Sequence, residues 1–458
     1  MKNLFLTIYQ ISFKKDEVHC HSERSEESHK PLLPQNLRFF TLFRMTLGKY
    51  FLLFLLFCLL FSCDIDITKV VLPEEQIKDA LLNTSPIPQN VFSLLEGNYS
   101  VEGAGNFFGN NAIMKCTRNY LSAFCSKNNS FCVFESGMNG NSMIFAGYWR
   151  FAQSDESGYI EMKIEDSITF SDLLNGIKPK SIVFNGNVYN ANTDSNLPIS
   201  FTFNYVGILK QSDFLIIGHR GGGRNIDRHP ASENSLAMLK YSERLGANAV
   251  EIDVKLTKDK VPVLFHDEYL SKRLIREEYF IGKVSDYSFE QLRSFCSLKN
   301  GEKIPTLTEA LDLILNETDL KLVWLDIKAT GLIELVAPIL KEYNLKAKEI
   351  GRELEILIGI PDEDVFNEFI SYKGFENIPS ICELDESYVF RANSKVWAPR
   401  WSLGLLTDRV QEIQSQGKKV FIWTLDEPQF IKRFIGNKLY DAILTNYPTN
   451  VAYQHFSM

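Results

Sequence analysis

The sequence predicts an α/β protein in which an all-β domain is followed by a (β/α)8 barrel. Two observations predict this order. Residues 91–206 hold short runs rich in β-branched and aromatic residues between Gly, Asn and Ser clusters, whereas strand and helix patterns alternate from residue 213 onward. The second part contains eight strand patterns in roughly 240 residues, which is the strand count and size of a (β/α)8 barrel. Periodicity alone would equally allow a doubly wound sheet.

The composition excludes several other classes of protein. The chain has 458 residues, of which 45% are hydrophobic and 23% are charged, so it is not a disordered, collagen-like or coiled-coil protein. Its formal net charge of -8 argues against non-specific binding to nucleic acid. An anionic substrate must therefore meet a local positive site. The eight cysteines are too sparse for a disulfide scaffold, and no CxxC pair suggests a zinc ribbon.

The first element in chain order is a predicted signal peptide at residues 45–62. Residues 50–61 form an unbroken apolar run with Lys49 before it and Ser62 after it. As a helix this run would span roughly 18 Å, short of a hydrocarbon core of roughly 30 Å, which favours a signal peptide over a transmembrane helix. The tetrapeptide LFSC, which ends at Cys63, resembles a bacterial lipobox. It predicts lipidation of Cys63 and a membrane-anchored extracytoplasmic lipoprotein, in the periplasm or on the cell surface of a bacterium; an uncleaved anchor or ordinary secretion is the alternative.

Residues 1–44 are expected to be a spurious extension and not translated protein. They are polar, mixed in charge and without apolar periodicity, and no export signal needs them. Met45 would give a conventional short basic region before the apolar run. Three histidines of this stretch, His19, His21 and His29, could be mistaken for a metal-binding tract.

Residues 63–90 are expected to form a linker, and residues 91–208 an all-β domain of about eight strands. This pattern predicts a sandwich-like domain, with a closed barrel as the alternative. One disulfide among its three cysteines is plausible in an exported protein. No catalytic constellation is found in the domain, and its role is not assigned. Its clearest strand patterns lie at 142–152, 158–166, 180–188 and 198–206.

Residues 213–452 contain the eight strands predicted for the (β/α)8 barrel, and helical patterns lie between several of them. In the clearest of these, TLTEALDLILN, Thr306 and Glu309 form a capping box ahead of an apolar helix face. The strand candidates are 214–219, 249–254, 321–328, 355–360, 379–384, 395–401, 419–425 and 440–446.

Alternation along two of these strands places acidic side chains on the inner face of the barrel. In AVEIDV, Glu251 and Asp253 share one face, while the apolar residues point toward the helices. In VWLDIK the same alternation places Asp326 and Lys328 inward. Buried carboxylates repel one another unless a cation lies between them, and three oxygen ligands without a Cys or His cluster favour Mg²⁺ or Ca²⁺. A buried salt-bridge network of the acids with Lys328 and Arg220 is the alternative.

Two histidines follow strand patterns near these acids. His219 ends the first strand and His266 ends the pattern VPVLFH, so both are expected at one face of the barrel. Imidazole takes and gives protons near neutral pH, which makes the pair candidate acid–base catalysts. His229 lies in a loop before Pro230 and is expected to be a surface residue.

These residues lie in a series of motifs that resembles the signature of the glycerophosphodiester phosphodiesterase family. The resemblance covers the C-terminal 240 residues and nothing before them. It implies a TIM barrel with metal-dependent hydrolysis of glycerol phosphodiesters to sn-glycerol 3-phosphate and an alcohol. The family usually has Glu where this chain has Asp326. The matching elements are HRG at 219–221, SEN at 232–234, GA at 246–247, EIDV at 251–254, TKD at 257–259, HD at 266–267, LDIK at 325–328, WTLD at 423–426 and ILTNYP at 443–448.

The resemblance also implies how the residues act. One histidine would deprotonate the glycerol hydroxyl next to the phosphate, whose attack gives a cyclic phosphate, and the other would protonate the departing alcohol. Arg220 and Lys328 would bind the phosphate. Ser232 and Asn234 are expected to be helix N-caps. Candidate substrate contacts near predicted strand ends are Trp397, Arg400 and Trp423. Glu233 is a further candidate contact, with a supporting role behind the site as the alternative.

Two other functions remain open at this point. A phospholipase D-like enzyme acting on intact lipid headgroups would form a cyclic lipid phosphate. An inert surface binding lipoprotein would bind its ligand through the β-domain and show no metal-dependent turnover. The expected partners are a small glycerophosphodiester and, through the lipid anchor, the membrane, with no nucleic acid.

Overall fold

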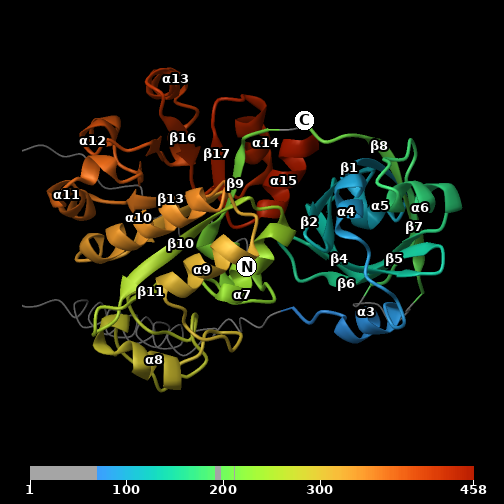
Figure 1. Cartoon of the computed structure of the whole chain (residues 1–458), viewed down its shortest axis with the longest axis horizontal. Coiled ribbons are helices and arrows are strands. Elements are labelled where there is room, and N and C mark those ends of the chain that lie inside the picture. Colours follow the sequence, from blue (N-terminus) through green and yellow to red (C-terminus); the bar gives the residue numbers. More distant parts are fainter. Residues whose placement is uncertain (1–69, 191–196, 211, 458) are drawn as a thin grey trace, which may run out of the picture. The chain divides into compact units, whose positions relative to one another are not determined.

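The computed structural model describes residues 70–190, 197–210 and 212–457. They form an eight-stranded antiparallel barrel and then a closed ring of eight parallel strands with helices around it (Figure 1). The predicted order of an all-β domain and a (β/α)8 barrel is confirmed, with a closed barrel in place of the predicted sandwich. The extension at 1–44, the signal peptide and Cys63 lie outside the described residues. Within the described ranges no helix has both the length and the apolar character needed to cross a bilayer.

In the described part of the chain, two short helices precede the first barrel. The first lies in the segment predicted to be a linker, and the second begins at the end of that segment. They are α3 (Glu74–Ala80) and α4 (Gln89–Leu95). Helix α4 buries Val91 and Phe92 in the core of the antiparallel barrel. Ile87, from the segment that the sequence assigned to the linker, is buried in the same core, so the β-domain includes residues of that segment.

The antiparallel barrel closes because its first strand pairs with both its second and its last strand. Large side chains such as Trp149 fill its interior, so it is a packed core. Local alternation predicts strands but not whether the first and last strands pair, which explains the difference from the predicted sandwich. The predicted disulfide is wrong, because Cys116, Cys125 and Cys132 are free thiols. The elements are β1 (Gly97–Gly103), α5 (Gly105–Phe108), β2 (Asn111–Thr117), β3 (Tyr120–Cys125), β4 (Ser130–Asn139), β5 (Ser142–Phe151), β6 (Ser157–Ile164), α6 (Ser167–Leu174), β7 (Val183–Val188) and β8 (Ile199–Gly207).

In the second barrel all eight ring strands are parallel, and β9 closes the ring by pairing with β10 and β17. All eight candidate strands of the sequence are confirmed. A further strand, β11 (Pro262–Leu264), pairs antiparallel with β10 and is not part of the ring; it is the pattern that precedes His266. The ring strands are β9 (Leu215–Gly218), β10 (Ala249–Leu256), β12 (Leu322–Ile327), β13 (Glu355–Ile360), β14 (Ser380–Cys382), β15 (Val396–Trp397), β16 (Lys419–Ile422) and β17 (Ala442–Thr445).

Helices follow the ring strands, as the alternating pattern predicts. Helix α9 begins with the predicted capping box, in which Thr306 Oγ1 accepts from the Glu309 N–H at 3.1 Å and the Glu309 carboxylate accepts from the Thr306 N–H at 2.9 Å. Helix α8 belongs to a segment between β11 and α9 that has a small core of its own. The helices are α7 (Leu236–Ser242), α8 (Phe289–Phe295), α9 (Leu307–Glu317), α10 (Ile333–Glu349), α11 (Glu363–Ser371), α12 (Glu386–Arg391), α13 (Thr407–Ser415), α14 (Pro428–Gly436) and α15 (Pro448–Ser457).

Alternation along the ring strands separates two cores. Ile252 and Val254 of β10 pack in the core between the strands and the helices. Ala249 and Trp324 belong to the smaller core inside the ring. Glu251 continues the inner face of β10 and is 2% exposed. The inward placement that alternation predicts for the acidic residues is therefore present in the fold.

Candidate active site

The turn after β9 brings His219 and Arg220 to the C-terminal end of the barrel strands. Arg220 has a φ of 53°, in the left-handed region that residues other than glycine rarely adopt. Gly222 follows with a φ of 149°, and a Cβ there would lie 2.5 Å from Met238 Cε. The glycine-rich segment therefore allows α7 to pack close behind the site.

Three carboxylates gather at the same end of the barrel. Asp253 and Asp326 are partners in the β10–β12 register, and one oxygen from each of these and Glu251 lies within 4.8 Å of the others. Glu251 Oε1, Asp253 Oδ1 and Asp326 Oδ1 are buried and have no hydrogen-bond partner in the described part of the chain. Buried carboxylate oxygens that accept no hydrogen bond are costly; Lys328 Nζ lies 3.3 Å from Asp253 Oδ1, and a bound cation would satisfy all three oxygens. The residues therefore fit a divalent metal site.

The pKa values of these acids are shifted in different directions. Burial, followed by repulsion from Asp253 and Asp326, raises the pKa of Glu251. Burial also raises the pKa of Asp326. Burial acts on Asp253 as well, but nearby cations, Lys328 first among them, hold its pKa below the ordinary value. Lys328 Nζ lies 3.3 Å from Asp253 Oδ1 and donates to Asp326. Lys328 is thus a cation beside the acids, as alternation along VWLDIK predicts.

An amide orients His219. Its Nδ1 lies 2.7 Å from Asn446 Oδ1, and Asn446 Nδ2 donates to Asp426 Oδ2 at 2.7 Å. Because the amide nitrogen is used by Asp426, the oxygen accepts from His219 Nδ1–H, and Nε2 of the neutral ring has a free lone pair. That Nε2 lies 3.8 Å from Glu251 Oε2. Burial, followed by the charge of Arg220, lowers the pKa of His219 to about 3.

A carboxylate orients His266. Its Nδ1 lies 2.7 Å from Asp267 Oδ1, and its Nε2 lies 2.8 Å from a guanidinium nitrogen of Arg220. Arg273 donates to both oxygens of Asp267, at 3.1 and 2.7 Å. Burial would raise the pKa of Asp267, but the hydrogen bonds from His266 and Arg273 hold it below the ordinary value. The two imidazoles therefore lie in the same site, but a neutral amide orients one and a carboxylate orients the other.

Glu233 orients the two arginines of the site. Its Oε1 accepts from Arg220 at 2.8 Å and from Arg273 at 3.1 Å. Its Oε2 accepts from the Asn225 N–H at 2.8 Å. The side chain is buried and both oxygens are used, so Glu233 positions Arg220, which is the supporting role that the sequence left open, and it is not placed to contact a substrate.

Asn234 binds an acid of the site and does not cap a helix. Its Nδ2 donates to Asp253 Oδ2 at 2.7 Å, and its Oδ1 accepts from the Asp253 N–H at 3.1 Å. The N-cap of α7 is Ser235, whose Oγ accepts from the Met238 N–H at 3.0 Å. The predicted caps, Ser232 and Asn234, are therefore wrong by three positions and one position, respectively.

The predicted contacts on the later strands lie in different environments. Trp397 is 2% exposed, donates to the Leu384 carbonyl at 3.0 Å and belongs to the core under the helices, so it has no surface for a substrate and this prediction is wrong. Trp423 packs against the inner core and donates to the Ala398 carbonyl at 2.7 Å. The Arg400 guanidinium lies 4.8 Å from the centre of the Trp423 ring and is exposed. Arg400 and Trp423 therefore remain candidate contacts.

His229 is buried, which corrects its prediction as a surface residue. It is 6% exposed, and neither ring nitrogen has a hydrogen-bond partner among the residues described. Burial, followed by the charge of Arg150, lowers its pKa to about 4. His229 lies beside the glycine-rich segment, since a Cβ on Gly223 would be 2.5 Å from its Nε2.

Sequence reasoning missed several residues that orient the site. Asn446, Asp426 and Asp267 lie inside matched motif elements, and that position could have identified them. Arg273 and Glu383 carry no such pattern. Glu383 follows β14; burial, followed by the charge of Asp326, raises its pKa to about 8.

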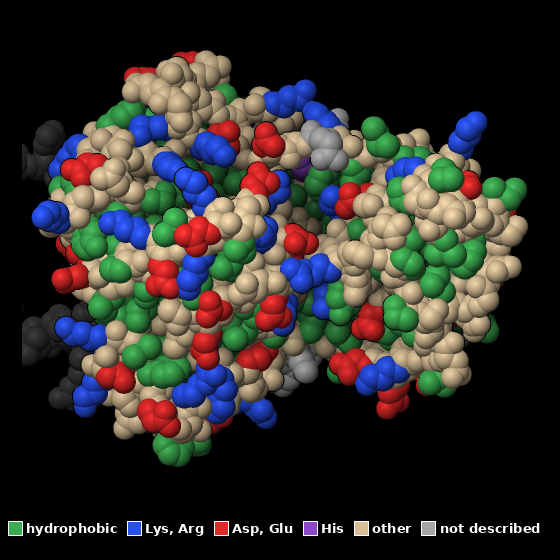
Figure 2. Space-filling view, in the orientation of Figure 1, with side chains coloured by type: hydrophobic (Ala, Val, Ile, Leu, Met, Phe, Trp, Pro, Cys, Tyr) green, Lys and Arg blue, Asp and Glu red, His purple; other side chains and the backbone are tan. Residues whose placement is uncertain are grey.

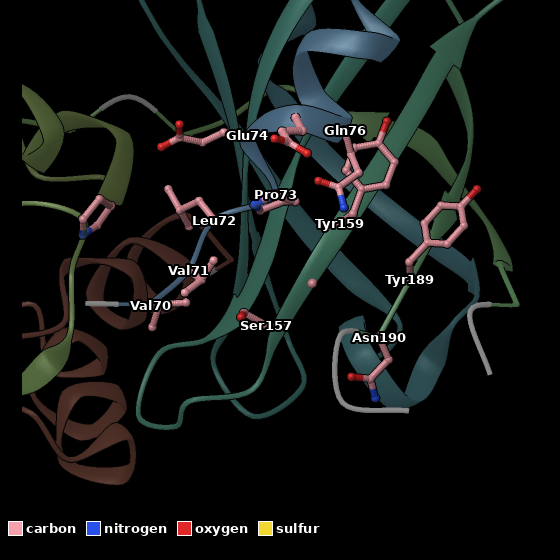
Figure 3. Close-up of a pocket in the computed structure, with 13 residues that line it drawn as sticks. Val70, Val71, Leu72, Pro73, Glu74, Gln76, Ser157, Tyr159, Tyr189 and Asn190 are labelled. Atoms are coloured by element: carbon pink, nitrogen blue, oxygen red, sulfur yellow. The ribbon is translucent and has the colours of Figure 1, made fainter. Parts of the chain in front are cut away.

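A separate cavity of about 870 Å³ contains none of these residues (Figure 3). It lies between residues 70–76 and β6, with Tyr159 and Tyr189 in its wall. The hydroxyls of both tyrosines donate to the Glu161 carboxylate, at 3.0 and 3.4 Å. The cavity is not part of the site that contains the histidines and the acids.

Comparison with known proteins gives matches to glycerophosphodiester phosphodiesterases. Residues 219–369 match the model of the Glycerophosphoryl diester phosphodiesterase family. A glycerophosphodiester phosphodiesterase of Caldanaerobacter subterraneus subsp. tengcongensis is 28% identical over 253 residues, which are 51% of this chain and 94% of that protein. Human glycerophosphodiester phosphodiesterase 1 is 37% identical over 118 residues, which are 24% of this chain and 33% of that protein.

A match among solved structures also covers about half of this chain. The structure of an Oleispira antarctica phosphodiesterase in complex with the product sn-glycerol-3-phosphate is 23% identical to this chain, with a TM-score of 0.43. The match covers 54% of this chain and 96% of that one.

Proposed function

Because the (β/α)8 barrel belongs to the glycerophosphodiester phosphodiesterase family, a family of phosphoric diester hydrolases, we propose that this chain hydrolyses glycerophosphodiesters to sn-glycerol 3-phosphate and an alcohol. One observation supports the proposal most directly. Two imidazoles, three carboxylates and two cations meet at one end of the barrel. Phosphodiester hydrolysis needs groups of these kinds, to move protons, to hold a metal ion and to neutralise the phosphate. The residues are His219, His266, Glu251, Asp253, Asp326, Arg220 and Lys328.

Glu251, Asp253 and Asp326 would hold the metal ion. Their hard oxygen donors favour Mg²⁺ or Ca²⁺. When bound, such an ion supplies Lewis-acid polarisation of the phosphate oxygens. Lys328 complements it as a fixed cation, because its ion pairs with Asp253 and Asp326 outweigh its burial and raise its pKa.

Arg220 would bind the phosphate and at the same time release His266. In the structure its guanidinium donates to Glu233 and lies 2.8 Å from His266 Nε2. A phosphate oxygen that accepts from this guanidinium would take the place of His266 Nε2 as its acceptor. The imidazole would then face the substrate.

The groups behind the histidines support a division of roles. His219 has a free lone pair on Nε2 and only a neutral amide, from Asn446, behind it. We assign it as the base that takes the proton of the attacking glycerol hydroxyl. His266 pairs with the Asp267 carboxylate, which stabilises an imidazolium, and we assign it as the acid that protonates the departing alcohol. Attack of the hydroxyl forms a cyclic phosphate, and water then opens the ring.

Alanine substitution of each histidine tests the proposal. We expect His219→Ala and His266→Ala to lower kcat on glycerophosphocholine and glycerophosphoethanolamine by 10²- to 10⁴-fold, the usual contribution of acid–base catalysis. His455→Ala, in α15 and away from the site, is the control. Activity of either site variant within about tenfold of the wild type would refute the assignment.

The cellular location is proposed from the sequence alone. Residues 45–62 and Cys63 support an exported lipoprotein, anchored to the membrane outside the cytoplasm. Intact mass of the mature protein tests this directly. A mature chain that begins at an acylated Cys63 is expected, and a mature chain that begins earlier would contradict it.

A further inference from the structure

Arg150 of the antiparallel barrel binds backbone carbonyls of the (β/α)8 barrel. This residue of β5 is 4% exposed. Its guanidinium donates to the Asp227 carbonyl at 2.8 Å and to the Arg228 carbonyl at 3.1 Å, while its Nε donates to Ser154 of its own barrel at 3.2 Å. Removal of Arg150 leaves the Asp227 carbonyl unpaired and leaves the Arg228 carbonyl only the Val70 N–H, at 3.4 Å, so these contacts help to fix the backbone of Asp227 and Arg228.

The two carbonyls belong to the segment that connects β9 to α7, residues 219–235, which contains Arg220 and Glu233. Arg228 has a φ of 55°, so the chain turns sharply there. The adjacent 3-10 turn spans Asn225–Asp227, and its first residue, Asn225, is hydrogen-bonded to Glu233. The Asn225 N–H donates to Glu233 Oε2 at 2.8 Å, and Asn225 Oδ1 accepts from the Glu233 N–H at 2.9 Å. A shift of this turn would therefore move the Glu233 carboxylate.

Glu233 continues this series of hydrogen bonds into the site. Its carboxylate holds the guanidinium of Arg220 at 2.8 Å, and that guanidinium lies 2.8 Å from His266 Nε2. An uninterrupted series of short polar contacts thus leads from Arg150 to a proposed phosphate-binding side chain. A contiguous network of this kind can carry coupling between Arg150 and Arg220, and substitution tests whether that coupling exists.

We propose that Arg150 is a positioning residue for Arg220, and that the antiparallel barrel serves to hold the segment at 219–235 in its active conformation. The inference rests on the proposed function for its kinetic measurement only. It gives a role to a domain that lies outside the matched residues 219–369.

A second contact between the barrels provides a matched control. Ser122 Oγ donates to the Arg244 carbonyl at 2.8 Å, as short as the Arg150 bond to Asp227. Arg244 lies in the 3-10 turn after α7 (Glu243–Leu245), and no hydrogen bond of the described residues leads from its carbonyl to the acids or histidines. Ser122→Ala thus removes one hydrogen bond between the barrels without a route to the site.

The experiment compares Arg150→Met and Ser122→Ala in the full chain, with hydrogen–deuterium exchange and steady-state kinetics. We expect Arg150→Met to speed exchange in 219–235 at least tenfold relative to Ser122→Ala, and to lower kcat/KM for glycerophosphoethanolamine about tenfold, chiefly through KM. Arg150→Lys, which retains one donor group, should recover part of both effects. In an Arg220→Ala background Arg150→Met should change kcat/KM less than twofold, because the residue through which it acts is gone.

Two results would overturn the inference. One is unchanged exchange in 219–235 in both Arg150 variants. The other is an equal loss of kcat/KM in Arg150→Met with and without Arg220. If Arg150→Met does not fold, Arg150→Lys is compared with Ser122→Ala by the same criteria. The exchange measurement does not depend on turnover, so inactivity of the wild type would count against the proposed function and not against the positioning role.

Discussion

At the scale of single residues, His219 and His266 differ in the charge of the group behind the ring. Asn446 presents an amide oxygen to one, and Asp267 presents a carboxylate to the other. A carboxylate stabilises an imidazolium more than a neutral amide does, which is the physical basis for assigning His266 as the acid. The assignment predicts that loss of the Asp267 charge affects the alkaline limb of the pH profile of kcat and not the acidic limb.

Asp267→Asn tests the role of this carboxylate. The substitution removes the charge that stabilises protonated His266, so the acid form is lost at lower pH and the alkaline limb of the kcat profile moves to lower pH. We expect kcat at pH 8 to fall by at least tenfold, with the acidic limb unchanged. The pH dependence of kcat, measured on one substrate from pH 5 to 9, checks this. A shift of the acidic limb alone would exchange the roles of the two histidines.

At the scale of elements, the turn between β9 and α7 depends on the glycine at 222. A Cβ there would meet Met238 Cε at 2.5 Å while the backbone keeps a φ of 149°. Gly351, with a φ of 70°, has no atom within 4 Å of an added Cβ. A Cβ at Gly222 would therefore bring both backbone strain and a steric conflict, whereas a Cβ at Gly351 would bring backbone strain alone.

Gly222→Ala is predicted to destabilise the protein more than Gly351→Ala. Overpacking adds about 1 to 3 kcal/mol to a backbone strain that is itself larger at a φ of 149° than at 70°. The free energy of unfolding from urea titration measures the difference. Equal losses in the two variants would show that α7 does not press against Gly222.

The strands also show how much of the site could be predicted from the sequence. Alternation placed Glu251, Asp253 and Asp326 inward, because side chains of a strand point to opposite faces whatever surrounds the strand. It could not place Asn446 beside His219, because these residues are 227 positions apart and meet only when β17 pairs with β9. Ring closure is a property of the whole barrel and leaves no local pattern.

Closure also explains the error in the β-domain, and the shortness of β15 explains the error at Trp397. The sequence predicted eight antiparallel strands but favoured a sandwich, because pairing of β1 with β8 joins residues about a hundred positions apart. Trp397 is the last residue of a short strand, and its side chain points to the helices because Val396 takes the inner face. A two-residue strand shows no alternation from which this could be read.

At the scale of the whole molecule, buried histidines link stability to pH. Burial lowers the pKa of His219 to about 3 and that of His229 to about 4. An unfolded chain titrates such residues near 6.5, so below that pH it binds protons that the folded chain does not. Each histidine therefore costs stability as pH falls from about 6.5 toward its folded pKa. A buried acid whose pKa is raised acts in the opposite sense, such as Glu243, whose pKa burial raises to about 7.

His229→Gln isolates one of these contributions. The difference in unfolding free energy between the variant and the wild type cancels the groups that they share. We expect the variant to gain stability relative to the wild type as pH falls from 7 to 4, because it cannot bind the proton that favours the unfolded wild type. Urea titrations at pH 7, 5.5 and 4 measure this. A difference that does not change with pH would show that His229 is not buried in its neutral form.

The proposed hydrolysis is tested most directly by the product formed from glycerophosphoethanolamine. The purified chain is incubated with this diester and Mg²⁺ or Ca²⁺, and sn-glycerol 3-phosphate is assayed. The account predicts sn-glycerol 3-phosphate and ethanolamine in equal amounts, loss of the activity on chelation, and recovery when the metal is returned. No sn-glycerol 3-phosphate with either metal, together with a cyclic lipid phosphate from intact phospholipid, would contradict it.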